Sequence, residues 1–187
     1  NKVGVAVGHD SVILRTTDGG ETWDLGYSAP EDEAPFFDVW FADAENGVAI
    51  GAYGSHYRTT DGGLTWEFEP VGDTDWHLHE IARAENGTLY IAAEAGFAYR
   101  SDDAGATWIE LPTPYEGSYF GVLPLEGDAV LLFGLRGHLF RSEDAGETWQ
   151  EIDTNTVAML TNGIRLSDDT IVIVGLGGTV LVSTNGG

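Results

Sequence analysis

Cysteine is absent from this chain, and only eight of its 187 residues are basic. Without cysteine the protein forms neither disulfides nor thiolate metal sites, although this leaves its redox compartment undetermined. No apolar run approaches the roughly 20 residues of a membrane-spanning helix. The N-terminal residues also lack the basic and then apolar layout of a signal peptide. We therefore expect no direct membrane insertion and no signal peptide within this chain.

The scarcity of basic residues contrasts with 31 acidic ones, which gives a formal net charge of −23. A surface this negative repels phosphate backbones and anionic lipid headgroups, so we expect no nucleic-acid partner. The acidity is explained most simply as a source of solubility in an exported or salt-adapted protein. The alternative is that it attracts a partner with a basic segment.

One nine-residue segment, RTTDGGETW at residues 15–23, dominates the sequence because it recurs at 58–66, 100–108 and 141–149. A shorter copy, VSTNGG, occupies residues 182–187. The central residue of the motif recurs at intervals of 43, 42, 41 and 41 positions. The residues that define the repeat are Asp18, Trp23, Asp61, Trp66, Asp103, Trp108, Asp144, Trp149 and Asn185. Repeats of this length with strand-like filling predict the blades of a β-propeller.

The motif has the composition of a turn between two strands. Asp18 can accept hydrogen bonds from the turn backbone, and Gly19 and Gly20 can adopt positive φ without a Cβ clash. The Trp that follows, Trp23 in the first copy, begins the next strand. A large indole that recurs once per repeat predicts packing between adjacent blades. We therefore assign the Asp and Trp of each copy a structural role.

The pattern Ser/Thr-x-Asp-x-Gly-x-Thr-Trp resembles the Asp-box, or bacterial neuraminidase repeat. This repeat occurs in sialidases, xyloglucan-degrading glycosidases, sortilin-type receptors and photosystem II stability and assembly factors. The Arg that opens each complete copy and the phrase NGVAIG at 46–51 most resemble the assembly factors and their non-photosynthetic bacterial relatives. The resemblance implies an all-β propeller of four-stranded antiparallel blades. It also implies an assembly or stability role for a membrane protein complex, on the lumenal, periplasmic or extracellular side.

The strand pattern predicts a single propeller segment with about four and a half blades. A partial blade at 1–26 has three strands, blades at 27–69, 70–111 and 112–152 have four each, and a partial blade at 153–187 has three. The two end blades lack different strands, so they cannot complete one another. We expect the segment to belong to a ring of roughly six to eight blades.

The order of strands within a blade predicts which loops share a face. The Asp-box turns and the short acidic turns between the first and second strands share one face. The opposite face carries the long, aromatic connections between blades and the turns between the second and third strands. Its candidate partner-binding residues are Tyr53, Trp76, His77, Tyr115, Tyr119 and Arg136. The alternative is that these aromatic residues simply cover the ends of the inner strands.

We assign no catalytic residue, cofactor or metal. A sialidase-type site needs three arginines around a carboxylate, yet four of the seven arginines open Asp-boxes, and Arg83 and Arg165 are expected far from Arg136. His77 and His79 point the same way on an inner strand, but no third metal ligand is fixed by spacing.

The sequence favours a non-catalytic, protein-binding propeller whose partner has a basic segment. The alternatives are a glycoside hydrolase or carbohydrate-binding propeller with active residues outside this segment, and a structural module of a larger secreted protein.

Overall fold

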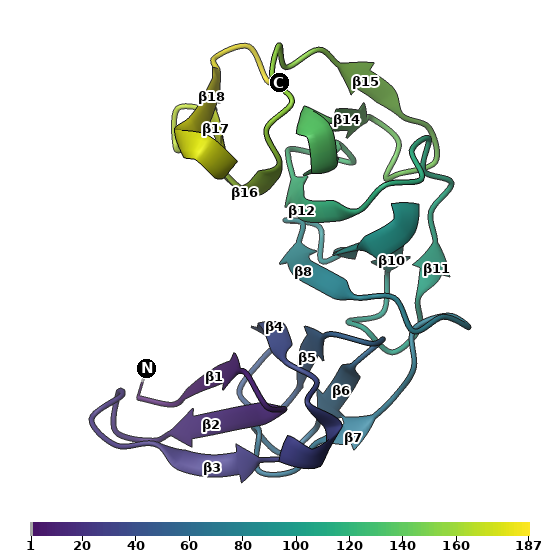
Figure 1. The fold of residues 1–187 in the computed structure, drawn as a ribbon. Coiled ribbons are helices and arrows are strands. Elements are labelled where there is room, and N and C mark those ends of the chain that lie inside the picture. Colours follow the sequence, from purple (N-terminus) through teal and green to yellow (C-terminus); the bar gives the residue numbers. More distant parts are fainter. Residues whose placement is uncertain (1) are drawn as a thin grey trace. The chain divides into compact units, whose positions relative to one another are not determined.

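The protein is all-β in a computed structural model that describes residues 2–187. The described residues form 18 strands in five antiparallel sheets, joined by turns and by four short 3₁₀ segments (Figure 1). The chain forms two compact units, one up to Ile81 and one from Ala82. No helix in the described part of the chain is long and apolar enough to cross a membrane.

The first unit holds two sheets in which neighbouring strands follow chain order. The first sheet contains β1 (Gly4–Gly8), β2 (Val12–Thr16) and β3 (Asp24–Tyr27). The second contains β4 (Phe36–Phe41), β5 (Gly47–Gly51), β6 (His56–Thr59) and β7 (Glu67–Phe68), and a 3₁₀ segment, η1 (Pro30–Asp32), precedes it. The predicted three-strand and four-strand blades are confirmed here.

The second unit continues the same pattern. The third sheet consists of β8 (Leu78–Arg83), whose residues up to Ile81 belong to the first unit, β9 (Leu89–Ala93), β10 (Ala98–Ser101) and β11 (Ile109–Glu110), with η2 at Glu94–Gly96. The fourth consists of β12 (Tyr119–Pro124), β13 (Val130–Gly134), β14 (Leu139–Ser142) and β15 (Gln150–Ile152), with η3 at Leu135–Gly137. The fifth consists of β16 (Leu160–Arg165), β17 (Ile171–Gly175) and β18 (Thr179–Ser183), with η4 at Leu176–Gly178. The strand numbers again match the prediction, whereas the membership of all blades in one ring stays a prediction.

The core lies between consecutive sheets within each unit. The second strands β5, β9 and β13 are buried along their whole length. They read as continuous apolar runs rather than as alternating patterns because both of their faces are covered. In the first unit, Ile13 of the first sheet packs with Phe36, Ala49 and Trp66 of the second. Stacking of sheets on one another is therefore what buries the apolar surface of each repeat.

Each Asp-box turn satisfies its own polar groups, as predicted. In the second copy, Asp61 Oδ1 accepts hydrogen bonds from the backbone N–H groups of Leu64 and Thr65 at 3.0 and 2.9 Å. The Thr65 hydroxyl donates to Asp61 Oδ2 at 2.7 Å, and the Thr59 hydroxyl donates to Asp61 Oδ1 at 2.9 Å. These hydrogen bonds stabilise the charged carboxylate and lower the pKa of Asp61 to about 2. Equivalent hydrogen bonds in the next two copies lower the pKa of Asp103 and of Asp144 to about 2.

The Trp residues follow the packing prediction only in part. Trp66 is 8% exposed, and its ring meets Phe41 edge to face with centroids 6.0 Å apart. Trp149 is half-buried against the cluster shared by the third and fourth sheets. Trp23, however, is 43% exposed, which corrects the expectation for the first copy. Trp66 packs toward the sheet before its own, and among the described residues no sheet precedes that of Trp23.

Three of the arginines that open the motif, Arg15, Arg100 and Arg141, bond the next repeat within their own unit. Arg15 Nε donates to the carbonyl of Gly62 at 2.7 Å, inside the Asp-box turn of the following sheet. Arg100 Nη1 donates to the carbonyl of Ala145 at 3.1 Å, and Arg141 Nη1 donates to that of Gly186. The three acceptors each follow the central Asp or Asn of their motif. The arginines therefore act as clasps between neighbouring blades.

Candidate partner-binding surface

The turn between the second and third strands has the same backbone conformation in all five sheets. Two consecutive residues in each turn have positive φ, and the first of them has a φ between 53° and 68°. These first residues are Asp10, Tyr53, Ala95, Arg136 and Gly177. The predicted equivalence of these positions is therefore confirmed. Left-handed φ is unusual for a bulky residue and costs of order 1 to 3 kcal/mol. Tyr53 and Arg136 thus stand where a small residue would be more stable.

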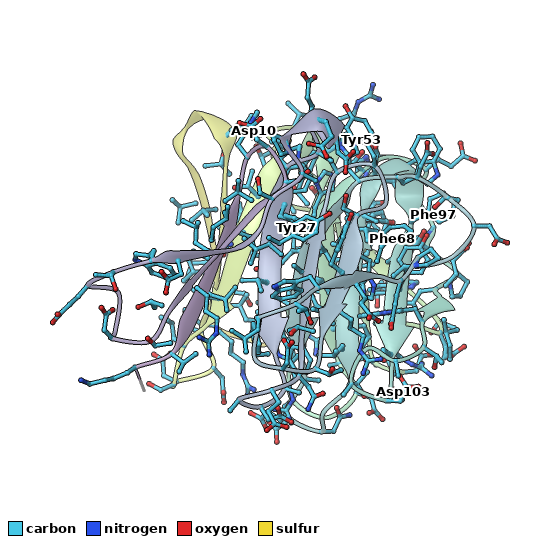
Figure 2. All side chains as sticks on the ribbon, turned by 90° about the horizontal axis from the view of Figure 1, so that it is seen from below. Asp10, Tyr27, Tyr53, Phe68, Phe97 and Asp103 are labelled. Carbon is cyan, nitrogen blue, oxygen red and sulfur yellow. The ribbon has the colours of Figure 1, made fainter. Side chains whose placement is uncertain are left out.

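The predicted separation of the two faces is also confirmed within each unit. Figure 2 shows Asp10 and Tyr53 at the same end of the first unit's strands, and Phe97 and Asp103 at opposite ends of the second unit's strands. At the Asp-box end, the N–H of Gly62 donates to the carbonyl of Glu45 at 2.8 Å. The Asp-box turns therefore contact the short acidic turns, and the long connections lie at the other end.

Two long connections hold Tyr53 in place from either side. The N–H of Ala52 donates to the carbonyl of Pro35 at 2.9 Å, and the N–H of Gly54 donates to that of Trp76 at 3.0 Å. A Cβ on Gly54 would lie only 3.1 Å from the carbonyl oxygen of Thr74, so glycine allows this close approach. These contacts fix the strained backbone of Tyr53, while its side chain stays 62% exposed.

Four aromatic rings lie together at this end of the first unit, and we name Phe37, Tyr53, His77 and His79 the aromatic cluster. Tyr53 and His77 meet edge to face with centroids 5.0 Å apart, and Phe37 stacks on His79 at 5.7 Å. The centroids of Phe37 and His77 are 6.0 Å apart, which joins the two pairs. Trp76, next to His77, is 38% exposed. The structure therefore brings Tyr53 and His77 together, with Trp76 next to His77 in the chain.

Phe37 was not among the predicted site residues. Strict alternation along β4 gives no reason to single out Phe37 as a site residue. The pairing of β4 with β5, however, shifts between Phe36 and Asp38. This bulge makes Phe37 an extra residue that is 42% exposed, while Phe36 is buried. The two adjacent phenylalanines were the only signal in the sequence.

Asp38 fixes the bulge and the strand that carries the histidines. Its carboxylate accepts hydrogen bonds from the N–H of Val39 at 2.8 Å and from the N–H of Ile81 at 3.0 Å. Burial raises the pKa of Asp38, and these two hydrogen bonds oppose that shift. Because Ile81 lies two residues after His79, the bond positions the stack of Phe37 on His79.

The predicted residues of the second unit divide into core and surface. Tyr119 is fully buried, and burial raises its pKa to about 12. This corrects the expectation that Tyr119 faces a partner, and it agrees with the alternative that the ring covers the inner strand. Tyr115 is half-buried, with its ring centroid 4.1 Å from that of His138, which bonds Glu151 at 2.6 Å. Arg136 is exposed and makes no side-chain hydrogen bond or ion pair within residues 2–187.

The remaining arginines lie as predicted. Arg83 and Arg165 line one pocket of about 380 Å³, together with Glu85 and Asp169. Arg165 pairs with Asp169 at 2.7 Å and with Glu126 at 3.5 Å, so its charge is already balanced. Arg136 does not line this pocket. Within residues 2–187, no group of three or more His, Asp or Glu side chains is arranged to hold a metal ion.

Small antiparallel sheets whose strands follow chain order, with an Asp-box turn after the third strand, define a segment of a β-propeller. Solved propellers match it: one titled "YCF48 bound to D1 peptide" is 24% identical, with a TM-score of 0.67 over 82% of this chain and 51% of that chain. YCF48 from Cyanidioschyzon merolae is 19% identical, with a TM-score of 0.66 over 83% and 55%. The chain thus spans about half the length of these two structures.

The GH74 enzyme of Niastella koreensis is 16% identical, with a TM-score of 0.77 over 98% of this chain and 34% of that one. No curated protein matches the sequence. The family model described as photosynthesis system II assembly factor YCF48 matches residues 29–187. This chain therefore belongs to the YCF48 family.

Proposed function

We propose that this chain is a non-catalytic propeller segment that binds an extended segment of a protein partner during the assembly or stabilisation of a membrane protein complex. The observation that carries the proposal is Tyr53, a large exposed side chain on a backbone conformation that favours a small residue. Strain of this kind persists where the surroundings enforce it, and it concentrates at sites of function.

The surroundings of Tyr53 fit peptide binding. Exposed aromatic rings give a large contact area at a small cost in side-chain entropy, and they are enriched among the residues that dominate binding energy. The connections that hold Tyr53 are rigidly bonded to its turn, so the surface is formed before binding. A YCF48 structure that this chain resembles is bound to a D1 peptide, which supports a peptide ligand here.

We place this activity on the lumenal, periplasmic or extracellular side of a membrane. The support is the family to which the chain belongs, together with its net charge of −23, which suits a soluble exported protein. A subunit of a membrane complex with a basic segment would be attracted to such a surface.

Site-specific photo-crosslinking tests the proposal. A photoreactive phenylalanine analogue at position 53 should crosslink to a subunit of a membrane complex, and the same analogue at position 102, an exposed Asp-box site, should not. Equal crosslinking from both positions would contradict the assignment of the surface.

Substitution of Tyr53 provides a second test of the proposed function. Tyr53→Gly relieves the left-handed strain, so the variant should fold at least as well as the parent while losing roughly tenfold or more in affinity for the crosslinked partner. Ala95→Gly, at the equivalent turn of the third sheet, is the matched control and should leave affinity unchanged. Hydrolysis of aryl glycosides that disappears with Tyr53→Gly would instead favour the glycosidase alternative.

A further inference from the structure

We infer that the aromatic cluster and its acidic surroundings select a positively charged side chain, best an arginine, from the bound segment. The inference rests on the proposed function, because it specifies which group of the partner the first unit recognises. Its basis is the combination of exposed ring surface and uncompensated negative charge at one end of this unit.

Three aromatic side chains at this end of the first unit are partly exposed. Tyr53 and Phe37 are 62% and 42% exposed, and Trp76 is 38% exposed. His77 contacts Tyr53 edge to face, and His79 stacks on Phe37. The face of an aromatic ring carries partial negative charge, so a guanidinium or ammonium group within about 6 Å of its centre is attracted to it. A planar guanidinium also stacks on such rings, which an ammonium cannot do.

The acidic residues belong to the two connections that hold Tyr53. The connection that ends at Pro35 carries Glu31, Asp32 and Glu33, and the connection that ends at Trp76 carries Asp73 and Asp75. All five carboxylates are exposed, and none of them forms an ion pair within the described part of the chain.

The basic side chains of the first unit do not balance this charge. Arg15 is bound to the carbonyl of Gly62 in an Asp-box turn, and Arg58 lies 3.6 Å from Glu69 of its own sheet. Lys2, the only lysine, lies where its backbone carbonyl accepts from Gly19, also in an Asp-box turn. The negative charge of these two connections, of which Asp75 lies next to the Tyr53 turn, can therefore attract a cation from outside.

An arginine meets both parts of this site at once, because its planar face covers a ring while its edge donates to carboxylates. An acidic or phosphorylated segment would be repelled by the five carboxylates. A neutral sugar would use the ring surface but would gain nothing from the charge.

The probe for this inference is a small molecule pair, acetyl-arginine amide and its neutral isostere acetyl-citrulline amide. The indole N–H of Trp76, assigned by loss of its signal in Trp76→Phe, serves as the NMR reporter, and the half-buried indole of Trp149 is the internal control. We expect the arginine amide to shift the Trp76 signal with a dissociation constant of about millimolar, as for a single small group. The citrulline amide should shift it at least several-fold less, and Tyr53→Gly should remove the arginine effect.

The outcomes separate this inference from the proposed function. Equal shifts with both amides, or an arginine shift that survives Tyr53→Gly, would overturn cation recognition. A second measurement is the affinity of the crosslinked partner segment when it is synthesised with citrulline in place of each arginine. If it binds as tightly as the natural segment but still requires Tyr53, the binding surface stands and the inference about arginine fails.

Discussion

A single buried indole takes part in the packing of the first two sheets. Trp66 is 8% exposed within a cluster that both sheets share, and its indole N–H makes no hydrogen bond in the described structure, so its contribution is packing. Trp66→Ala should therefore lower the free energy of unfolding by about 3 to 5 kcal/mol. Trp23→Ala is the matched control, because Trp23 is 43% exposed and its removal should cost far less. Denaturant unfolding measures both, and equal losses would refute the packing role of Trp66.

The Asp-box carboxylates predict a loss of stability in acid. Because hydrogen bonds lower the pKa of Asp61 to about 2 in the folded state, against about 4 for an unfolded aspartate, the folded state binds fewer protons in this window. The contribution is fully present above pH 4 and is lost as the pH falls from about 4 to about 2. The side-chain oxygen of Asn185 accepts a hydrogen bond from the Ser183 hydroxyl at 2.7 Å, so an amide in place of the Asp retains part of the hydrogen bonding of the turn.

The measurement compares Asp61→Asn with Glu67→Gln, which also removes one negative charge but lies on an exposed strand outside the Asp-box. Relative to Glu67→Gln, the destabilisation caused by Asp61→Asn should shrink as the pH is lowered from about 5 to about 2. A difference between the two variants that does not change with pH would show that the charge of Asp61 adds nothing to the turn.

At the scale of the element, the hydrogen bond from Arg15 joins the first sheet to the second. Arg15 is partly buried and donates to a backbone carbonyl of the following sheet, and hydrogen bonds from charged donors contribute about 1.5 to 3 kcal/mol. Arg15→Met keeps an aliphatic stem but leaves the Gly62 carbonyl without this donor, so we expect a loss of about 1 to 2 kcal/mol in thermal or denaturant unfolding. Lys2→Met removes one positive charge from the same unit and should leave stability nearly unchanged. If Arg15→Met leaves the stability unchanged, solvent replaces the hydrogen bond from Arg15 to the Gly62 carbonyl.

The sequence predicted elements better than it predicted side-chain positions. The interval of 41 to 43 residues placed the strands, the turns and the two faces, because turn chemistry and strand length are local properties. The burial of Tyr119 and the exposure of Phe37 were not predicted, since bulges in β4 and β12 break the alternation on which such an assignment depends. The clasp of Arg15 on Gly62 joins residues 47 apart and has no local signature beyond the recurring arginine.

At the scale of the whole molecule, the net charge of −23 should give salt two effects of opposite sign. Carboxylates of one chain repel one another, so screening should raise the denaturant midpoint as NaCl increases from about 50 to about 500 mM. Over the same range the affinity for a basic partner segment should fall, because the charges that attract it are screened over about 8 to 10 Å. Calorimetric titration of the crosslinked segment measures the second effect, and the segment with citrulline in place of arginine is its control. Affinity that stays constant while stability rises would show that ring packing alone holds the segment, and that the acidity of this chain serves its solubility.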